Sequence, residues 1–311
     1  MIPKALIALG LLAVAAAPAE AASFDCRKAG TPIEKAICAD PKLSQADADV
    51  AKAFAALSPV VGDREPFTEG QRAWLKQRDA IDPGDAASLL DLHGRRIADL
   101  RAQFAKATAP FPAADVAKTC VPIAAAPAGK ACTVESSGPV PGGKDLVYQA
   151  VAYTLDDDLS SHAIVVLAPV RGQPGQLGTV VVNYTESGGF DDPKVVVNSF
   201  GRFLDLGGSE SGTGNFNIGQ LYIQQADGLR LVDSDSWEKQ LAKRLPEGLG
   251  AWKGIYPDFG KMIAGTPLWK SDDGNCCPTG GYADVTLGFT GQKIVLKDVK
   301  VKLGEKAASG E

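Results

Sequence analysis

The sequence has few of the features that mark metal sites, nucleic-acid surfaces and membrane spans. It contains two histidines, His93 and His162, and no pair of its six cysteines has Cys-x-x-Cys spacing, which argues against zinc. Its net charge is −5, and its basic residues form no stripe along which a phosphate backbone could bind. Beyond residues 5–17, no apolar run approaches the length of a membrane-spanning helix. We therefore expect no cofactor, no metal, no nucleic-acid partner and no membrane span.

The first 21 residues are typical of a secretory signal. Lys4 supplies the positive start, residues 5–17 are apolar, and Ala19-Glu20-Ala21 is a small-x-small cleavage site. We expect a mature chain that begins at Ala22 and is periplasmic or secreted. An even number of cysteines in an exported chain implies disulfide bonds. These cysteines are Cys26, Cys38, Cys120, Cys132, Cys276 and Cys277.

Residues 22–106 have a helical pattern. Thr31-Pro32-Ile33-Glu34 predicts a capping box with proline at the first helical position. Asp40 is expected to cap a second helix, which ends at Ser58-Pro59. A third helix carries Trp74 and Arg78, and a fourth follows the turn at residues 82–85. The sequence thus predicts a small helical domain over residues 22–106.

Residues 107–128 are rich in alanine and proline and are predicted to be a linker. Apolar residues then alternate with polar ones, which indicates a β-rich domain over residues 129–303 and a flexible tail over 304–311. A short helix capped by Asp235 interrupts the strands. We expect an α+β protein, with a helical module followed by a β sandwich or open barrel. The expected strands are 146–153, 163–168, 179–185, 194–200, 220–225, 229–232, 285–289 and 293–301.

Two separated motifs occur in order within the helical region. They are Phe24-Asp25-Cys26 with residues 31–38, Asp40-Pro41, Leu43 and Asp47, and then residues 71–75 with Arg78-Asp79. Together they resemble the N-terminal domain of LprI-type lysozyme inhibitors over about residues 24–104. The resemblance implies a helical envelope module that acts on lysozyme, with Glu34, Asp40, Trp74 and Arg78 as structural motif residues.

The resemblance also implies one disulfide pairing. Members of that family usually have two further cysteines, one soon after the Arg-Asp pair and one in the last helix. Both are missing here, since Ile81 follows Arg78-Asp79-Ala80 and the last helix has no cysteine. Their joint absence leaves Cys26 and Cys38 as mutual partners.

The other four cysteines have three possible pairings, two of which cross-link the pairs. Adjacent Cα atoms lie about 3.8 Å apart, whereas ordinary disulfides span about 4.4–6.8 Å, so a bond between Cys276 and Cys277 is disfavoured. We therefore predict that these two residues bond to Cys120 and Cys132, in either order. The alternative is a bond between Cys276 and Cys277, which would mark a redox or ligand-sensing site.

Residue types used by hydrolases are present outside catalytic motifs. Ser160-Ser161-His162 follows Asp156-Asp157-Asp158 with no nucleophile elbow, so a polar turn is the favoured interpretation. Asp233-Ser234-Asp235 and residues 272–275 offer oxygen ligands for calcium, although helix capping and a turn explain them better. Loop carboxylates that could pair for glycoside hydrolysis are Glu186, Asp191, Asp192, Glu210, Asp233 and Asp235. We expect no enzymatic activity.

Two further segments could bind a partner. Residues 207–214 are rich in glycine and lack the lysine of a phosphate loop, which favours a flexible connection or a partner-binding loop. Aromatic residues gather in a stretch of 33 positions, where they could stack on sugars, anchor an interface or, as the favoured interpretation, fill a core. They are Trp237, Trp252, Tyr256, Phe259 and Trp269.

We expect a non-enzymatic exported binding protein. The leading hypothesis is that the helical module binds or inhibits lysozyme or another peptidoglycan-cleaving enzyme, because an acidic protein complements a basic enzyme. The alternative hypothesis is an envelope ligand-binding or structural module that acts through the β domain. A hydrolase is the least favoured class.

Overall fold

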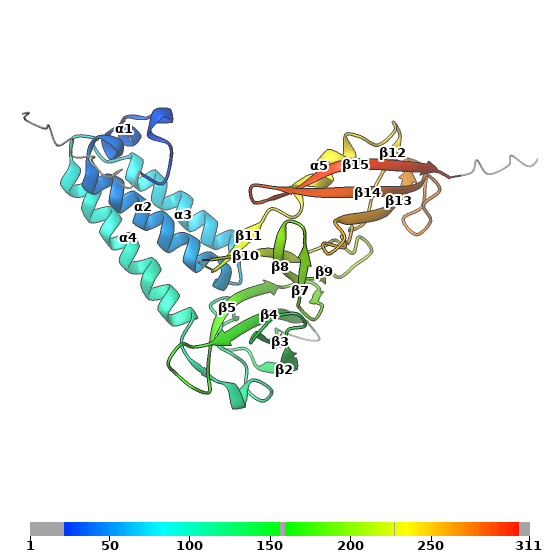
Figure 1. Cartoon of the computed structure of the whole chain (residues 1–311), viewed down its shortest axis with the longest axis horizontal. Coiled ribbons are helices and arrows are strands. Elements are labelled where there is room, and N and C mark those ends of the chain that lie inside the picture. The colour runs from blue at the N-terminus through cyan, green and yellow to red at the C-terminus, as the bar shows by residue number, and fades with distance from the viewer. Residues whose placement is uncertain (1–21, 156–158, 227, 305–311) are drawn as a thin grey trace, which may run out of the picture. The chain divides into compact units, whose positions relative to one another are not determined.

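The computed structural model describes residues 22–155, 159–226 and 228–304 (Figure 1). They divide into a helical unit, residues 22–55 and 70–101, and a β unit, residues 56–69 and 102–304. The predicted α+β class is confirmed, with helices first and strands after them. The expected signal sequence, the run Asp156-Asp157-Asp158 and residues 305–311 of the expected tail lie outside the described residues.

Four helices make up the first part of the chain. They are α1 (Pro32–Ala39), α2 (Pro41–Leu57), α3 (Arg64–Asp79) and α4 (Ala86–Ala107), with short 3₁₀ turns at Cys26–Lys28 and Ser58–Val60. The predicted domain boundary at residue 106 is wrong, because residues 56–69 and the end of α4 from Ala102 belong to the β unit. Within the described ranges, none of the helices combines the length and apolarity needed to cross a bilayer.

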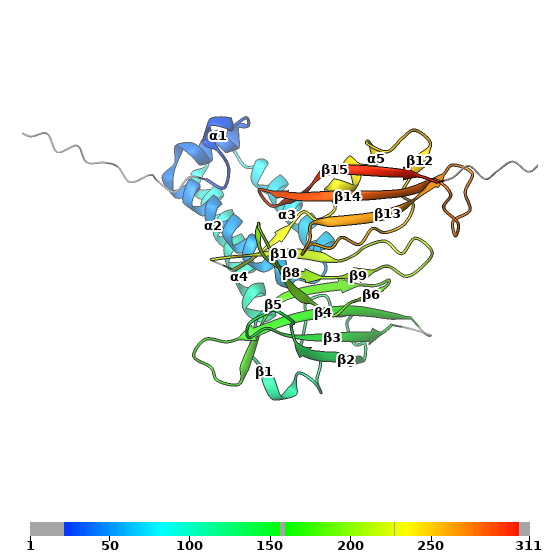
Figure 2. The ribbon, with the colours of Figure 1, turned by 45° about the vertical axis from the view of Figure 1, so that its right-hand side comes forward.

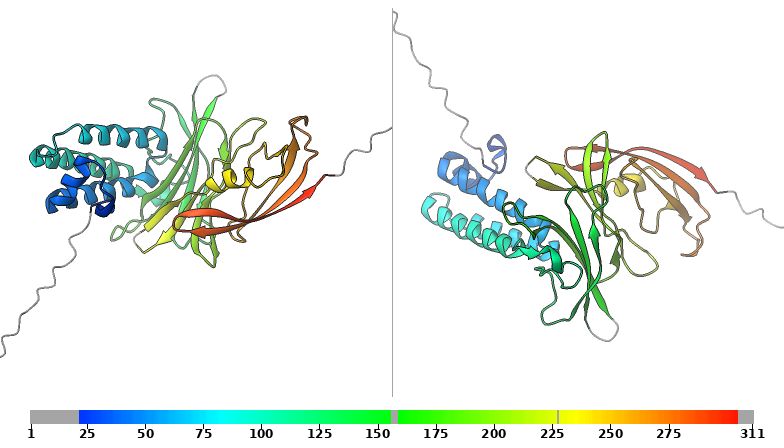
Figure 3. Two further views of the ribbon diagram at one scale, coloured as in Figure 1. Left: turned by 90° about the horizontal axis from the view of Figure 1, so that it is seen from above. Right: turned by 60° about the horizontal axis from the view of Figure 1, so that its bottom comes forward.

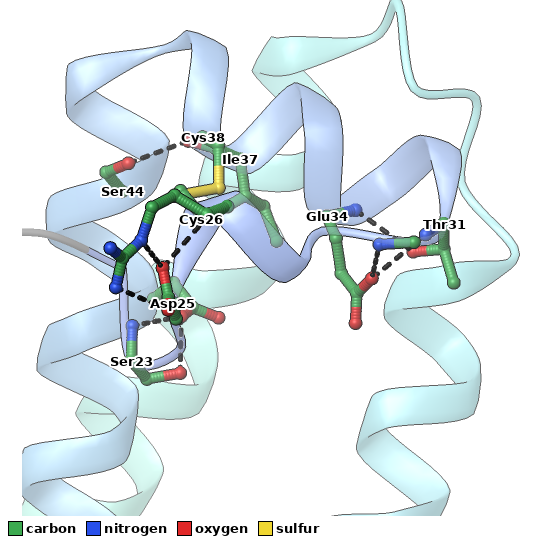
Figure 4. Close-up of a disulfide and its surroundings, with 11 residues drawn as sticks. Ser23, Asp25, Cys26, Thr31, Glu34, Ile37, Cys38 and Ser44 are labelled. Carbon is green, nitrogen blue, oxygen red and sulfur yellow. Dashed lines mark hydrogen bonds and ion pairs between the residues drawn. A yellow bond between two sulfur atoms is a disulfide. The ribbon is translucent and has the colours of Figure 1, made fainter.

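Local capping explains where the first two helices begin. The Thr31 hydroxyl accepts from the Glu34 N–H at 3.1 Å, and the Glu34 carboxylate accepts from the N–H groups of Thr31 and Gly30 at 2.9 and 2.7 Å (Figure 4). These bonds from Thr31 and Gly30 lower the pKa of Glu34. The Asp40 carboxylate accepts from Lys42 N–H at 2.7 Å. The capping box and the Asp40 cap are both confirmed.

A disulfide bond ties the start of the helical unit to α1. Cys26 and Cys38 are bonded with Cα atoms 5.8 Å apart (Figure 4), so their predicted pairing is confirmed. The bond closes a loop with a sequence separation of 12. Such a closure restricts the unfolded chain and stabilises the fold.

Replacing both Cys26 and Cys38 with serine is expected to lower the free energy of unfolding of the helical unit by about 3 kcal/mol, from loop entropy alone. Urea unfolding followed by the helical circular-dichroism signal measures this loss. The control replaces both Cys276 and Cys277. Their bond closes no loop of intervening residues, so its loss is expected to leave the urea midpoint almost unchanged. An unchanged midpoint in the Cys26/Cys38 variant would show that the bond is not a staple.

From Phe111 onwards, the β unit contains fifteen described strands and one α-helix. In chain order they are β1 (Phe111–Pro112), β2 (Cys132–Pro139), β3 (Val147–Thr154), β4 (Ser160–Pro169), β5 (Gln176–Thr185), β6 (Gly189–Phe190), β7 (Lys194–Asn198), β8 (Gly201–Leu206), β9 (Gly208–Ser209), β10 (Gln220–Gln225), β11 (Gly228–Val232), α5 (Ser236–Ala242), β12 (Leu249–Gly250), β13 (Ile263–Lys270), β14 (Gly281–Thr290) and β15 (Lys293–Leu303). All eight predicted strands are present, with ends shifted by a few residues, whereas β2, β8 and β13 and the shortest strands were missed.

The strands form three antiparallel sheets and one two-stranded pair, β6-β9. The sheets have the orders β1-β5-β4-β3-β2, β11-β10-β8-β7 and β12-β13-β14-β15. Figure 2 shows β2 to β5 side by side in the first sheet and β13 to β15 side by side in the third. Both faces of the second sheet are covered: Tyr222 packs against β3, β4 and β5, whereas Leu221 and Ile223 pack against α5, β14 and β15. The second sheet is therefore the middle layer of the β unit (Figure 3).

The predicted linker over residues 107–128 is wrong. Phe111, Val116, Val121 and Ile123 are buried in one cluster with residues of β3, β4 and β5. The Gln149 side chain binds this segment directly, accepting from the Val121 N–H at 2.8 Å. Alanine and proline suggested a flexible chain, but four well-spaced apolar side chains cover one face of the first sheet.

The predicted cross-links between the cysteine pairs are also wrong. Cys120 bonds to Cys132, with Cα atoms 6.4 Å apart, and Cys276 bonds to its neighbour Cys277. The first pair joins the segment that covers the first sheet to the start of β2, at an ordinary disulfide span. The second pair lies between β13 and β14 of the third sheet. The two pairs thus belong to different sheets.

Candidate functional site

A polar cluster is buried in the helical unit around Asp47. One carboxylate oxygen accepts from the N–H and the hydroxyl of Ser23 at 2.8 and 2.6 Å. The other lies 3.6 Å from an Arg78 guanidinium nitrogen and 3.9 Å from Nε2 of His93. The rings of Trp74 and His93 meet edge to face with their centroids 5.2 Å apart. The Arg78 guanidinium group lies over the Trp74 ring. Asp47, Trp74, Arg78 and His93 are all buried, so this cluster has the contacts of a packed core.

Burial and charge act in opposite directions on Asp47. Burial raises the pKa of its carboxyl, but the approach of His93, the hydrogen bonds from Ser23 and the charge of Arg78 outweigh it, so the pKa is lowered. Nδ1 of His93 lies 2.7 Å from the Leu89 carbonyl oxygen. Since a carbonyl oxygen only accepts, Nδ1 carries a proton and Nε2 faces Asp47. The carboxylate thus stays ionised inside the helical unit.

The residue types of a nucleophilic triad are not assembled among the described residues. Ser161 is fully buried in β4, and its hydroxyl has no hydrogen-bond partner within the part of the chain that the structure describes. His162 instead lies 3.2 Å from the carboxylate of Glu135 on β2. The polar residues around position 160 are therefore part of strand β4 and not of a turn.

Two carboxylates at the start of α5 have different roles from those predicted. Asp233, not Asp235, accepts from the Ser236 N–H at 3.0 Å, and it lies 3.5 Å from the Lys293 ammonium group. The predicted Asp235 cap is wrong, because its side chain makes no capping bond to the helix. Burial, helped by the charge of Asp235, raises the pKa of Glu238 to about 7.

One buried carboxylate, that of Asp205, was not predicted from the sequence. Asp205 of β8 lies 3.5 Å from the Lys194 ammonium group of β7, its partner in the strand register. Burial raises the pKa of Asp205, Lys194 lowers it, and the nearby charges of Asp191 and Asp258 raise it again. A Lys-Asp pair facing each other on adjacent strands would have been the signal in the sequence. Within the described ranges, no three His, Cys, Asp or Glu side chains group into a metal site.

The predicted aromatic stretch divides into core and surface. Trp237, Phe259 and Trp269 are buried, as expected for core residues. Trp252 and Tyr256 are 36% and 45% exposed. Trp252 stacks on Trp269 with ring centroids 6.0 Å apart and an interplanar angle of 16°. A buried ring thus supports an exposed one.

Trp252 and Tyr256 face away from the core. Along this segment Ala251 and Ile255 pack into the core that α5 shares with β14 and β15, while the two aromatic side chains are exposed. Between them, Gly254 donates its N–H to the Gly214 carbonyl oxygen at 3.0 Å. A side chain at Gly254 would strike the backbone of residues 215 and 216, so only glycine permits this close approach.

The glycine-rich loop brings a third aromatic residue to this place. Phe216, 51% exposed, has its Cα beside Gly254. The Asn217 side-chain amide donates to the Ile255 carbonyl oxygen at 3.3 Å, and the Tyr256 hydroxyl donates to the Asn215 carbonyl oxygen. We call Phe216, Trp252 and Tyr256 the aromatic surface. Its two segments are fixed to each other by hydrogen bonds.

Polar groups border the aromatic surface. The pKa of Tyr256 is raised, mainly by partial burial. A hydrogen bond with Ser209 lowers this pKa, and the charge of Asp191 raises it. Ser209 is therefore a hydrogen-bond partner of the Tyr256 hydroxyl, and the charge of Asp191 acts on it. The sequence indicated aromatic residues at 252 and 256, but Phe216 was missed because it lies 36 positions before Trp252.

No family model, curated protein or solved structure matches this chain. The resemblance of residues 24–104 to LprI-type lysozyme inhibitors therefore stays a prediction. The candidate site is defined by its own geometry, which is a set of exposed aromatic side chains on two hydrogen-bonded segments, one of them supported by a buried ring.

Proposed function

We propose that this protein is an exported, non-enzymatic binding protein whose β unit binds glycan chains on the aromatic surface. The observation that carries the proposal is the stacking of exposed Trp252 on buried Trp269, with exposed Tyr256 and Phe216 on two segments that are hydrogen-bonded to each other. Export is supported by the signal-like sequence of residues 1–21 and by disulfide bonds, which persist in oxidising compartments.

Sugar rings match this combination of groups. Each ring has a face of C–H groups that stacks on an aromatic ring, and hydroxyl groups at its edge that need hydrogen-bond partners. Trp252, Tyr256 and Phe216 supply the rings, while the Tyr256 hydroxyl and Ser209 supply polar groups. Because hydrogen bonds and stacking already fix both segments, binding loses little side-chain and loop entropy.

The resemblance supports lysozyme binding by the helical unit, but the charge of that unit supports it less. Residues 22–55 and 70–101 contain 10 Asp and Glu and 11 Lys and Arg, so this unit has no acidic excess. Electrostatic attraction to a basic enzyme would therefore have to come from the remainder of the chain. We accordingly place the binding surface on the β unit.

Replacing Trp252 and Tyr256 together with alanine is expected to weaken binding to insoluble peptidoglycan about 100-fold. Each ring is assigned about tenfold in affinity, or about 1.4 kcal/mol, within the range for stacked aromatic contacts. Sedimentation of the full chain with purified peptidoglycan, and with chitin as a second glycan, measures the affinity. Unchanged binding by the double variant would contradict the proposal.

The matched control is Phe200→Ala. Phe200 is 43% exposed and contacts Phe289, and it lies outside the aromatic surface. Its loss is expected to leave sedimentation unchanged. In parallel, a cell-wall lysis assay tests lysozyme: inhibition that survives in the double variant, without glycan binding by the wild-type chain, would favour the helical unit as the binding module instead.

A further inference from the structure

The loop between β13 and β14 carries a disulfide between adjacent residues. Cys276 and Cys277 are bonded, and both are exposed. The Cys277 N–H donates to the Gly274 carbonyl oxygen at 2.9 Å, which makes a tight turn at the tip of the loop. The bond is therefore open to approach from solvent.

The base of this loop is held independently of the disulfide. One oxygen of the Asp273 carboxylate accepts from the N–H groups of Lys270 and Thr279, both at 2.7 Å. The other accepts from the Thr279 hydroxyl at 2.7 Å. These bonds tie the end of β13 to the residues that precede β14. Opening the Cys276–Cys277 bond would thus release the tip of the loop and leave its base in place.

The other two disulfides differ in both geometry and surroundings. Cys26–Cys38 and Cys120–Cys132 have Cα separations of 5.8 and 6.4 Å, and they pack against apolar core clusters. The Cα atoms of Cys276 and Cys277 are only 3.8 Å apart. That separation lies below the usual range of about 4.4–6.8 Å, and departures from this range make a disulfide easier to reduce.

Structural stabilisation does not account for the bond. A disulfide stabilises a fold chiefly by closing a long loop in the unfolded chain. Adjacent cysteines close no intervening residues, so this bond restricts the unfolded chain very little. Exposed disulfides that are not structural are the ones that exchange with thiols.

We infer that Cys276–Cys277 is a thiol–disulfide exchange site that accepts two electrons from a dithiol. A thiolate of the dithiol attacks one sulfur and forms a mixed disulfide, and the other cysteine leaves as a thiolate that takes up a proton. The second thiol of the dithiol then attacks the mixed disulfide. The products are two cysteine thiols on this chain and one disulfide on the reductant, so atoms and electrons balance.

Limited reduction of the folded full-length chain with dithiothreitol tests this inference. Alkylation followed by peptide mapping is expected to label Cys276 and Cys277 at least tenfold faster than any of the other four cysteines. Labelling of Cys276 and Cys277 no faster than Cys26, Cys38, Cys120 or Cys132 would overturn it. The helical circular-dichroism signal, unchanged during the fast phase, establishes that the chain stays folded.

A control variant separates exchange from general exposure of thiols. The chain with Cys276→Ser and Cys277→Ser is expected to lose the fast phase completely and to keep the slow reduction of the other two bonds. A fast phase that persists in this variant would assign it to another disulfide and refute the inference. Because the readout is labelling rate, the result does not depend on glycan binding.

Discussion

Replacing Trp74 with alanine is expected to lower the free energy of unfolding of the helical unit by about 3–5 kcal/mol, the usual cost of removing a large buried aromatic side chain. Trp74 is 6% exposed, and its ring contacts His93 edge to face and lies under the Arg78 guanidinium group. The variant would leave a cavity beside two polar side chains. Hydrogen exchange of peptides from α3 and α4, measured in the full chain, reports the loss.

The control for this prediction is Trp252→Ala. Trp252 is the same residue type, but it is 36% exposed. Its loss is therefore expected to leave hydrogen exchange in the helical unit unchanged. If the Trp74 variant kept full protection in α3 and α4 but no longer inhibited lysozyme, Trp74 would be an interface residue and not a core residue.

Asp47→Asn is expected to lower the stability of the helical unit by about 3 kcal/mol at neutral pH, the lower end for removing one partner of a buried ion pair. The asparagine oxygen can still accept from Ser23, but it carries no charge to balance Arg78, which is 9% exposed. Arg78 keeps its contact with Asp79 at 2.8 Å, which is why the lower end applies. Urea unfolding at several pH values measures the difference.

The pH dependence has a definite direction. The pKa of Asp47 is lower in the folded protein than in the unfolded chain. Its stabilisation is therefore complete above the unfolded value of about 4 and is lost as pH falls through the lower folded value. The stability gap between the wild-type chain and Asp47→Asn is expected to be largest near neutral pH and to narrow below about pH 4.

Asp79→Asn is the matched control, since Asp79 contacts the same arginine from a side chain that is 49% exposed. An exposed partner contributes about 0–1 kcal/mol. Equal losses in the two variants, or a gap for Asp47→Asn that widens on acidification, would contradict the central role assigned to Asp47.

Helices and their caps were predictable because the bonds that start them are local. Thr31 and Glu34 are three residues apart, and Asp40 acts on the residues that follow it. The same reasoning failed at α5, where Asp233 caps in place of Asp235. Both aspartates precede the helix, and only the path of the chain decides which carboxylate reaches the N–H.

Strands were predictable where apolar residues alternate and unpredictable where pairing alone creates them. β2 contains Glu135, Ser136, Ser137 and Gly138, and β13 contains Gly265 and Pro267, all residue types that are depleted in strands. They are strands because neighbours with stronger patterns, β3 and β14, pair with them. The pairing, and not the residue types of β2 and β13 themselves, makes these segments strands.

The aromatic surface and the cysteine pairing were out of reach for a related reason. Phe216 meets Gly254 through loop contacts that no periodic pattern encodes. The ordinary span of a disulfide disfavours a bond between Cys276 and Cys277, but that span is a tendency across proteins and not a bound on one of them. Covalent geometry gave the distance correctly, but it did not decide the pairing.

The interrupted helical unit has a consequence for synthesis on the ribosome. The segment between α2 and α3 belongs to the β unit, where Gly62 pairs with Asn183 of β5. The ribosome therefore makes this segment about 120 residues before its partner strand emerges, a delay of roughly 6–24 s at 5–20 residues per second. During that interval Val60 and Val61, both buried in the finished protein, have no strand to cover them. A chaperone that holds nascent apolar segments would bind the chain here.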